Sequence, residues 1–414
     1  MRIVLTLLLM SWLSLPAWSA EDWPQFRGPS GDGHAGNAKP PTQWSEKSAN
    51  IRWKTPIHDK GWSSPVILGD QVWLTTALAN GKTFFAVCVD KATGKIIHDL
   101  PIFTEENPAF CHAYNSYATP TPVIEPGRIY VHFGSHGTAC LDTATGKKLW
   151  ERRDIKCDHF RGPGSSPILY GDLLILTFDG FDVQFLVALN KSTGETVWKT
   201  NRDLRYSSSN GDLHKAYSTP SVFRINGNDR LFSPAAESTV AYDPLTGKEL
   251  WKVNHGGMNE AAKPVMGNGL VYLTSGHTAQ LLAVRPNGEG DVTKSDIVWK
   301  SPKGVPTRPS LLLDGAYLYM VSDNGIASCL DAKTGKQQWQ ERLGGAFCAS
   351  PILANGNLYL CDEEGKIHVI AAKPEYESLA VNKLADGCMA SPAVSGNALF
   401  IRTKTHLYRI EDGK

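Results

Sequence analysis

The sequence of 414 residues predicts an all-β fold, an eight-bladed β-propeller made of four-stranded antiparallel blades. Two repeated motifs and the near absence of helical periodicity support this prediction. The first motif is Asp/Asn-x-x-Thr-Gly, with its glycines at Gly94, Gly146, Gly194, Gly247 and Gly335. The second is a blade-opening phrase such as SSPVILGD, with its prolines at Pro65, Pro122, Pro167, Pro220, Pro264, Pro309, Pro351 and Pro392. Their spacing of roughly 41–57 residues is typical of propeller blades.

Each repeat unit contains the signals for four strands in order. The first strand begins at the proline, where a missing N–H is tolerated. A turn rich in Gly, Asn and Asp follows, as at Gly69 and Gly127, and an alternating second strand comes next, as in residues 71–74. The third strand ends at the Asp or Asn of the first motif. There Thr binds the backbone and Gly supplies the positive φ of a hairpin.

The fourth strand of a unit ends in tryptophan. Units two to six end this way, at Trp150, Trp198, Trp251, Trp299 and Trp339. His98 takes this place in unit one, and the position has degenerated in unit seven near Val381. We expect each tryptophan to pack between neighbouring blades and to bury on the order of 200 Å².

The eighth unit supplies only three strands before the chain ends, at residues 393–394, 399–402 and 407–410. The segment NIRWKTPI, residues 50–57, reads as a fourth strand with its own Trp53. We therefore expect residues 50–57 to pair with the last strands and close the ring, which removes exposed sheet edges.

The amino-terminal segment resembles an export signal. Arg2 precedes an apolar run from Ile3 to Leu15, which is too short to span a bilayer, and a small-residue cleavage site follows at Ser19 or Ala20. We expect residues 1–20 to be a signal peptide, residues 21–48 an extended arm anchored by Trp23, Phe26 and Trp44, and residues 49–414 a single propeller. The mature protein is then periplasmic or secreted.

Composition narrows the classes of partner. Lys and Arg together number 42 and Asp and Glu 41, so a net charge of +1 provides no long-range attraction to nucleic acid or anionic lipid. No later stretch is long and apolar enough to be a transmembrane segment, and no nucleotide-binding or hydrolase motif is present. We expect a monomer that binds no nucleic acid.

Connector length points to one face of the ring. The loops that lead from one unit to the next are longest at residues 99–121, 151–166 and 199–219, whereas the turns on the opposite face are tight. Long connectors without strands of their own are typical of binding surfaces. The candidate ligand- or partner-binding residues are His112, Tyr114, Asn115, Tyr117, Asp158, His159, Arg161, Tyr206 and His214, with Asn259 and Glu260 from the fourth connector.

These polar residues leave more than one interpretation open. They can bind loop backbone, or they can line a site for a small molecule or peptide. Arg161 is the best candidate contact for a carboxylate, because its guanidinium binds both oxygens. No catalytic residue is assigned.

The eight cysteines divide into two groups. Cys88, Cys140 and Cys329 share one repeat position, and we expect them and Cys361 to face the blade interior. Cys111 and Cys157 lie in neighbouring connectors, where a disulfide, a zinc site completed by His112 and His159, and free thiols are the alternatives. Cys348 and Cys388 raise the same disulfide question.

The Asp-x-x-Thr-Gly-Lys-x-x-Trp pattern resembles the pyrroloquinoline-quinone-like (PQQ-like) repeat over residues 49–414. The opening DWPQFRGPSGDG is similar to exported quinone-binding-like propellers, and the eight blades are similar to those of the outer-membrane assembly propeller lipoproteins (BamB-like). The resemblance implies a propeller that either binds proteins or holds PQQ with calcium for alcohol oxidation. Those oxidoreductases use two adjacent cysteines beside the quinone, and this chain has none.

We therefore expect an exported scaffold that recognises a protein, peptide or glycan through the face with the long connectors. No cofactor is required by this interpretation. The alternative is a PQQ-dependent oxidoreductase with its quinone over the central funnel.

Overall fold

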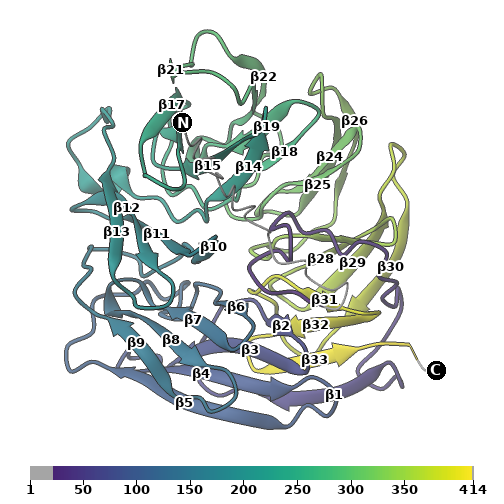
Figure 1. Cartoon of the computed structure of the whole chain (residues 1–414). Helices are drawn as coiled ribbons and strands as arrows, with labels where there is room; N and C mark the ends of the chain where they lie inside the picture. Colours follow the sequence, from purple (N-terminus) through teal and green to yellow (C-terminus); the bar gives the residue numbers. More distant parts are fainter. Residues whose placement is uncertain (1–21, 413–414) are drawn as a thin grey trace, which may run out of the picture.

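The computed structural model describes residues 22–412, and its strands form eight sheets arranged as a ring (Figure 1). The predicted eight-bladed propeller is confirmed, since seven sheets have four strands and one has an added fifth. Helix among the described residues is limited to three short 3-10 turns, η1 (Gly134–His136), η2 (Gly211–His214) and η3 (Gly276–Thr278). The predicted signal peptide, residues 1–20, lies outside the described residues.

The blades follow one another in chain order, and each runs from an inner to an outer strand. Blades one to four are β2 (Val66–Leu68), β3 (Gln71–Ala77), β4 (Thr83–Asp90) and β5 (Ile96–Thr104); β6 (Val123–Glu125), β7 (Arg128–His132), β8 (Thr138–Asp142) and β9 (Lys148–Arg152); β10 (Ile168–Tyr170), β11 (Leu173–Asp179), β12 (Gln184–Asn190) and β13 (Thr196–Asn201); and β14 (Ser221–Ile225), β15 (Asn228–Pro234), β16 (Ser238–Tyr242) and β17 (Glu249–Asn254). Blades five to seven are β18 (Val265–Gly267), β19 (Leu270–Thr274), β20 (Leu281–Val284) and β22 (Ile297–Ser301); β23 (Leu312–Asp314), β24 (Tyr317–Val321), β25 (Ile326–Asp331) and β26 (Gln337–Arg342); and β27 (Ile352–Ala354), β28 (Asn357–Cys361), β29 (Lys366–Ala371) and β30 (Ser378–Lys383).

The two ends of the propeller meet in blade eight. Its inner strands are β31 (Ala393–Ser395), β32 (Ala398–Arg402) and β33 (His406–Ile410), and its outer strand is β1 (Ile51–Pro56). β1 pairs antiparallel with β33, in a register that runs from Ile51 opposite Ile410 to Pro56 opposite His406. The predicted closure of the ring by the amino-terminal strand is therefore confirmed (Figure 1).

Two local features differ from the regular pattern. The insertion between β20 and β22 carries β21 (Gly290–Asp291), which pairs in parallel with β17 and adds a fifth strand to blade four. In blade six the first strand begins at Leu312, three residues after Pro309, although it begins directly after the proline in the other blades. Ser310 therefore takes the place that the residue before the proline holds elsewhere, a shift that the spacing of prolines did not reveal.

The tryptophans pack between blades as the repeat predicts. In each case the indole N–H donates to a backbone carbonyl in the turn of the next blade, at 2.9–3.2 Å, for Trp53, Trp150, Trp198, Trp251, Trp299 and Trp339. For Trp53, Trp150, Trp198 and Trp299, the glycine of the same turn also lies against the indole ring. A Cβ on Gly194, for example, would stand 2.7 Å from Trp150, and its φ of +77° also favours glycine. The Thr-Gly motif is thus an inter-blade contact as well as a turn.

The hydrophobic core is divided among the blade junctions. One cluster joins Tyr130 and Cys140 of blade two to Leu174 and Val187 of blade three, for example. Cys88, Cys140, Cys329 and Cys361 are buried, as the sequence predicts. A buried ion pair lies at the junction of blades three and four, where Arg202 donates to both carboxylate oxygens of Asp179 at 2.6 and 2.8 Å and to the Ser233 hydroxyl of blade four at 2.7 Å.

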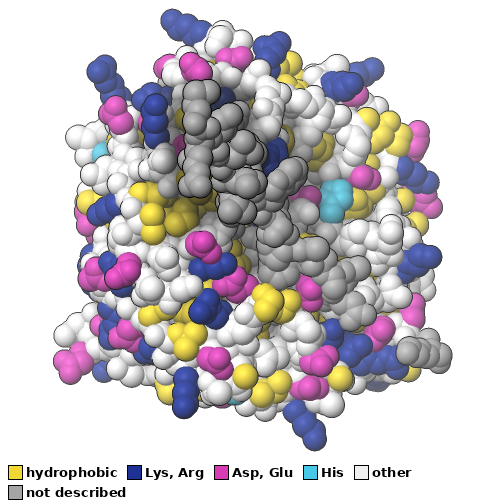
Figure 2. Space-filling view, viewed as in Figure 1, with side chains coloured by type: hydrophobic (Ala, Val, Ile, Leu, Met, Phe, Trp, Pro, Cys, Tyr) yellow, Lys and Arg dark blue, Asp and Glu magenta, His cyan; other side chains and the backbone are white. Residues whose placement is uncertain are grey.

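The segment of residues 22–48, here called the arm, crosses the ends of several blades. Trp23 pairs with Ile67 of blade one, and His34 pairs with Leu353 of blade seven. Trp23 is 1 % exposed and Trp44 is 7 % exposed. The face shown in Figure 2 mixes Lys and Arg with Asp and Glu, without a broad area of one sign. Among residues 22–412, no helix has the length and apolar character that crossing a bilayer requires.

Candidate functional site

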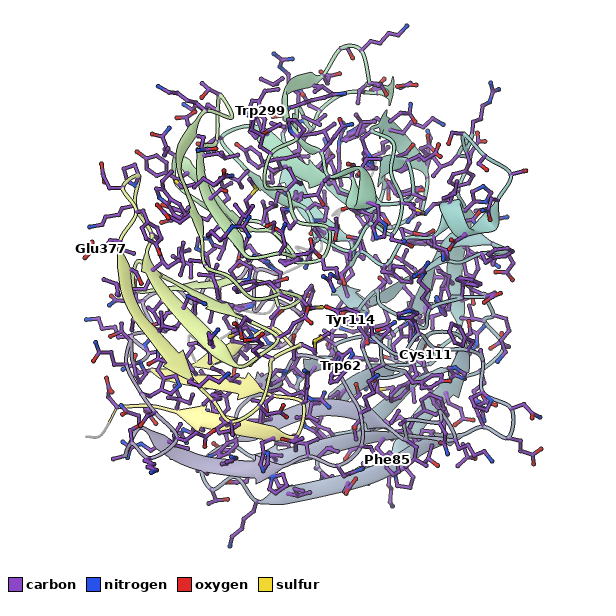
Figure 3. The ribbon with its side chains drawn as sticks, turned by 180° about the vertical axis from the view of Figure 1, so that it is seen from behind. Trp62, Phe85, Cys111, Tyr114, Trp299 and Glu377 are labelled. Atoms are coloured by element: carbon purple, nitrogen blue, oxygen red, sulfur yellow. The ribbon has the colours of Figure 1, made fainter. Side chains whose placement is uncertain are left out.

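A pocket of about 590 Å³ occupies the centre of the ring on the side of the inter-blade connectors. The connectors reach it because each one runs from the outer strand of one blade to the inner strand of the next. Its aromatic walls are Trp62 and Tyr114, and Figure 3 shows both near the centre of the ring. A pocket of this size accommodates a small molecule or several residues of a peptide.

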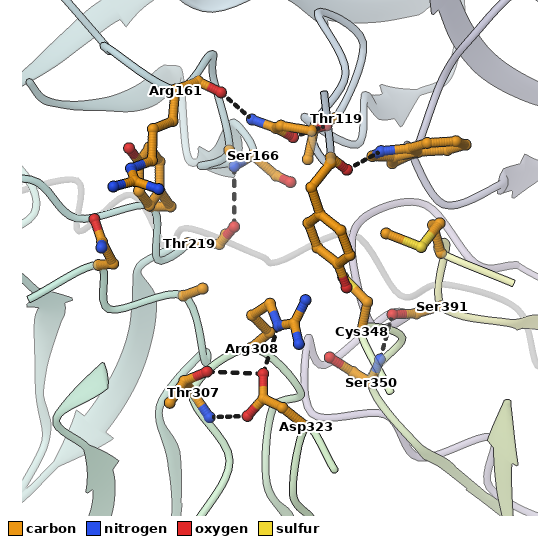
Figure 4. Close-up of a pocket in the computed structure, with 18 of the residues that line it drawn as sticks. Thr119, Arg161, Ser166, Thr219, Thr307, Arg308, Asp323, Cys348, Ser350 and Ser391 are labelled. Carbon is orange, nitrogen blue, oxygen red and sulfur yellow. Dashed lines mark hydrogen bonds and ion pairs between the residues drawn. The ribbon is translucent and has the colours of Figure 1, made fainter. Parts of the chain in front are cut away.

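A ring of hydroxyl groups surrounds the central axis of the propeller at the pocket. The residue two positions before the first strand is a Ser or Thr in seven blades, namely Ser64, Thr121, Ser166, Thr219, Ser310, Ser350 and Ser391. Each of these hydroxyl oxygens accepts a backbone N–H from the preceding blade, at 2.9–3.1 Å. Figure 4 shows two of these bonds, from Ser166 to Thr219 and from Ser350 to Ser391. An accepting hydroxyl keeps a proton to donate. The ring therefore supplies donors suited to carbonyl or anionic oxygens.

The arm closes the pocket at its inner end. Phe26 lines the pocket, and the neighbouring Arg27 is 1 % exposed and donates to the backbone carbonyl of Leu311 at 2.7 Å. Lys263 takes the eighth position in the hydroxyl ring and reaches the arm, where a Cβ on Gly31 would lie 2.3 Å from its Nζ atom. Burial lowers the pKa of Lys263 to about 7. The arm is thus the floor of the pocket.

Two arginines give the pocket its charge. Arg161 and Arg308 come from connectors three blades apart, and the remaining charged group of the lining is Asp323. Asp323 is already bound, because it accepts the N–H and hydroxyl of Thr307 at 2.7 Å and pairs with Arg308 (Figure 4). Two cations against one carboxylate leave the lining with a net charge of +1.

Arg161 has unused binding capacity. Its closest carboxylate is that of Asp212, 3.9 Å from Nη2, and its Nε atom is buried without a hydrogen-bond partner among the described residues. A buried donor without a partner is unfavourable. The Arg161 side chain as a whole is 38% exposed, so its terminal N–H groups can donate to a carboxylate or carbonyl oxygen of a ligand.

Tyr114 extends from the first connector across the pocket to the far wall. Its hydroxyl donates to Glu363 of blade seven, and the Arg308 guanidinium lies 4.6 Å from its ring centroid. The indole N–H of Trp62 donates to the Tyr114 carbonyl at 3.0 Å. Burial raises the pKa of the Tyr114 hydroxyl. It stays protonated and serves as a donor and a cation-binding ring.

Five of the predicted site residues line this pocket: His112, Tyr114, Asn115, Arg161 and Asn259. His112 and Asn115 also fix the connectors. The His112 Nδ1 atom accepts the Tyr114 N–H at 3.2 Å, and Asn115 donates to the carbonyls of Arg161 and Pro163 at 2.9 and 3.0 Å. The first two long connectors are therefore joined to each other beside the pocket.

Other predicted residues are held inside the connectors and do not line the pocket. Tyr117 is 9 % exposed and donates to Ala109, and His159 stacks on Phe178 with centroids 5.9 Å apart. Burial lowers the pKa of His159 to about 4, so its imidazole is neutral. Asp158 is exposed and accepts the Phe160 N–H at 2.8 Å.

Part of the third connector turns away from the pocket. Tyr206 and His214 stack on each other at 3.9 Å, and His214 contacts the Ser208 carbonyl. Glu260 is 1 % exposed and accepts the hydroxyl of Thr274. Burial raises the pKa of Glu260 well above its ordinary value. From the third connector, Tyr217 and Thr219 line the pocket, whereas Tyr206 and His214 do not.

Several lining residues were not predicted from the sequence. Trp62 lies just before blade one, and Phe26 lies in the arm. The short connectors before blades six and seven supply Arg308 and Cys348, and a turn of blade six supplies Asp323. Connector length was a misleading guide, because even a short connector must pass the central axis. The sequence did contain one indication of a lining residue, because Arg308 directly precedes the blade-opening Pro309.

The cysteines are all thiols in the structure, so Cys111 and Cys157 form no disulfide. The Cys157 thiol lies 3.8 Å from His159 Nδ1, whereas Cys111 contacts the carbonyls of His112 and Arg161. Residues 22–412 contain no group of three or more His, Cys, Asp or Glu side chains arranged to hold a metal. Cys348 is the thiol of the pocket, and burial raises its pKa to about 11.

The pocket does not fit the quinone and calcium of the dehydrogenases. A calcium site takes six to eight oxygen ligands, usually with several carboxylates. The pocket offers Asp323 alone, and the Arg308 cation already lies against it. The thiol of Cys348 has no neighbouring cysteine in sequence.

Comparison with known proteins agrees with the fold. The family model described as outer membrane protein assembly factor BamB matches residues 42–238 and 236–376. The chain belongs to this family. A relative from Legionella pneumophila, an outer membrane protein assembly factor BamB, is 24% identical over 242 residues, which are 58% of this chain and 48% of the relative. The match thus spans about half the length of that relative.

Solved structures of two kinds share the propeller. BamB from Moraxella catarrhalis has a TM-score of 0.61 at 14% identity, over 87% of this chain and 99% of that one. A europium-containing methanol dehydrogenase has a TM-score of 0.71 at 11% identity, over 92% and 89% of the two chains. Identities this low show the fold alone, so the pocket itself must indicate the function.

Proposed function

We propose that this protein is an exported binding scaffold that holds a carboxylate-bearing peptide segment of a partner protein in its central pocket. The Arg161 guanidinium carries the proposal, because it lines the cavity, its side chain is 38% exposed and its nearest carboxylate is 3.9 Å away. The family description, an assembly factor, supports a protein as the partner.

The shape and chemistry of the pocket favour a peptide. Arg161 and Arg308 bind carboxylates from two sides, the hydroxyl ring donates to backbone carbonyls, and Trp62 and Tyr114 provide apolar surfaces. No side chain of the lining combines a nucleophile with a general base, since the Cys348 thiol stays protonated at neutral pH. Binding without turnover is the function that this combination supports.

A peptide array tests the proposal. Peptides of about twelve residues with free terminal carboxylates are compared with their amides against purified protein lacking the signal segment, and affinities are measured by fluorescence anisotropy. We expect selected acids to bind with micromolar affinity and their amides to bind at least about tenfold more weakly, as loss of a charge-assisted pair predicts.

Two variants and one control locate the site. Arg161→Gln and Arg308→Gln should each weaken binding of the acids about tenfold or more. Arg224→Gln, at a side chain that is 68% exposed in β14 of blade four and does not line the pocket, should not. Equal binding by all three variants would refute the proposal, as would dye-linked alcohol oxidation after PQQ and calcium are added.

A further inference from the structure

Three phenylalanines form an exposed cluster beside the pocket. Phe110 is 65% exposed, Phe160 38% and Phe181 40%. Ring centroids of Phe110 and Phe160 are 6.4 Å apart, and those of Phe160 and Phe181 are 5.6 Å apart in a stacked arrangement. We call these three residues the aromatic platform. They come from the first connector, the second connector and the hairpin between β11 and β12, so three separate segments converge to build it.

The backbone under the platform is held in an unfavourable conformation. Phe160 has φ of +57°, which is a genuine outlier for a bulky residue. Hydrogen bonds fix it, because the Phe160 N–H donates to the Asp158 carboxylate at 2.8 Å and the Phe181 N–H donates to the Asp158 carbonyl at 2.7 Å. The loop thus maintains a strained residue in order to present a phenyl ring to solvent. Contiguous exposed aromatics of this kind are typical of interaction sites.

The platform is continuous with the cationic wall of the pocket. Arg161 follows Phe160 directly, and its guanidinium lies 5.9 Å from the Phe160 ring centroid while it also lines the pocket. The ammonium group of the buried Lys215 lies 4.2 Å from the same ring. The group that would bind a ligand at Arg161 is therefore itself 5.9 Å from an aromatic ring of the platform.

We propose that the aromatic platform binds an apolar or aromatic side chain of the partner peptide whose carboxylate is bound at Arg161. The proposal rests on the proposed function and names the sequence class of the peptide. Side chains two residues apart on an extended chain point to the same side and are separated by about 7 Å. The preferred peptide therefore carries an aromatic or large aliphatic residue two positions before its carboxylate.

Peptides and platform variants test this together. The probes are labelled peptides with a terminal carboxylate that differ in one residue, Phe or Ser, two positions before the end. The variants are Phe110→Ser, Phe181→Ser and Phe160→Asn, since Asn tolerates a positive φ. Leu245→Ser is the matched control, because Leu245 is 53% exposed on the turn side of blade four.

We expect the Phe peptide to bind the natural protein about tenfold more tightly than the Ser peptide, and this preference to disappear in the platform variants but not in the control. Melting temperatures should stay within a few degrees, so that lost affinity is not lost folding. A preference that survives all three variants overturns the inference while Arg161→Gln still tests the proposed function. If Arg161→Gln also has no effect, both fail.

Two other occupants give different results. An oligosaccharide array that binds through the platform, with no peptide preference, would overturn the inference in favour of a glycan. Concentration-dependent dimerisation lost in Phe110→Ser, again without a peptide preference, would overturn it in favour of a second copy of the chain.

Discussion

The two sides of the propeller differ in how far their contacts are repeated from blade to blade. On the turn side, six blades repeat one contact, in which an indole N–H donates to a backbone carbonyl of the next blade, and in four of them a Thr-Gly turn packs on the indole. On the connector side, only the hydroxyl ring recurs, and Arg161, Tyr114 and Phe160 each occur once. A contact repeated in every blade serves the fold, whereas a departure in one blade marks a residue available for a ligand.

Removing the strand that closes the ring should have the largest effect on stability. Deletion of residues 50–57 takes away β1 and leaves β33 as an open edge. We expect aggregation and a melting transition that is lowered or lost, measured by light scattering and calorimetry. A deleted protein that stays monomeric with an unchanged melting temperature would contradict the role of β1.

A matched pair of tryptophans compares the two sides directly. Trp251 is 0% exposed between blades, so Trp251→Ala should lower the free energy of unfolding by about 3–5 kcal/mol. Trp62 is partly exposed at the pocket, so Trp62→Ala should cost about 1 kcal/mol or less but weaken peptide binding. Urea unfolding and anisotropy measure both. Similar losses of stability would show that the two sides do not differ in this way.

Acid should destabilise the connector side through its buried histidines. Burial lowers the pKa of His255 from 6.5 to about 4. The unfolded chain therefore binds a proton below pH 6.5 that the folded protein does not, and stability falls as the pH falls from 6.5 to 4. His255→Gln removes this proton, so the stability of the natural protein relative to the variant should decline by about 3 kcal/mol over that range. Parallel pH curves from urea unfolding would contradict the assignment.

The fold could be predicted because its signals are local and repeated. Pro, Gly and Trp at fixed positions define strands and turns in any blade, and Trp53 revealed the closing strand. The shift of the first strand after Pro309 could not be predicted, because the spacing of prolines does not reveal one irregular blade. Strand β21 could not be predicted either, because it forms only by pairing with β17 of the preceding blade.

The pocket was only partly predictable, since polarity does not tell which way a side chain points. His159 and Arg161 are two residues apart in one connector, yet the first stacks on Phe178 and the second lines the pocket. The exposure of Phe160 between them could not be predicted, because an apolar side chain is expected to be buried in the core. The positive φ that exposes it is set by contacts with residues 158 and 181, which only the folded structure brings together.

The arm and β1 also set an order for the making of this protein. Synthesis begins at the amino end, so residues 22–56 leave the ribosome before their partners in blades six to eight exist. Arg27 contacts Leu311, His34 pairs with Leu353, and Ile51 pairs with Ile410, so none of these contacts can form until the later blades have been made. The floor of the pocket and the closed ring are therefore completed only after blades six to eight have been synthesised, and a chain truncated before β33 leaves β1 without its partner strand.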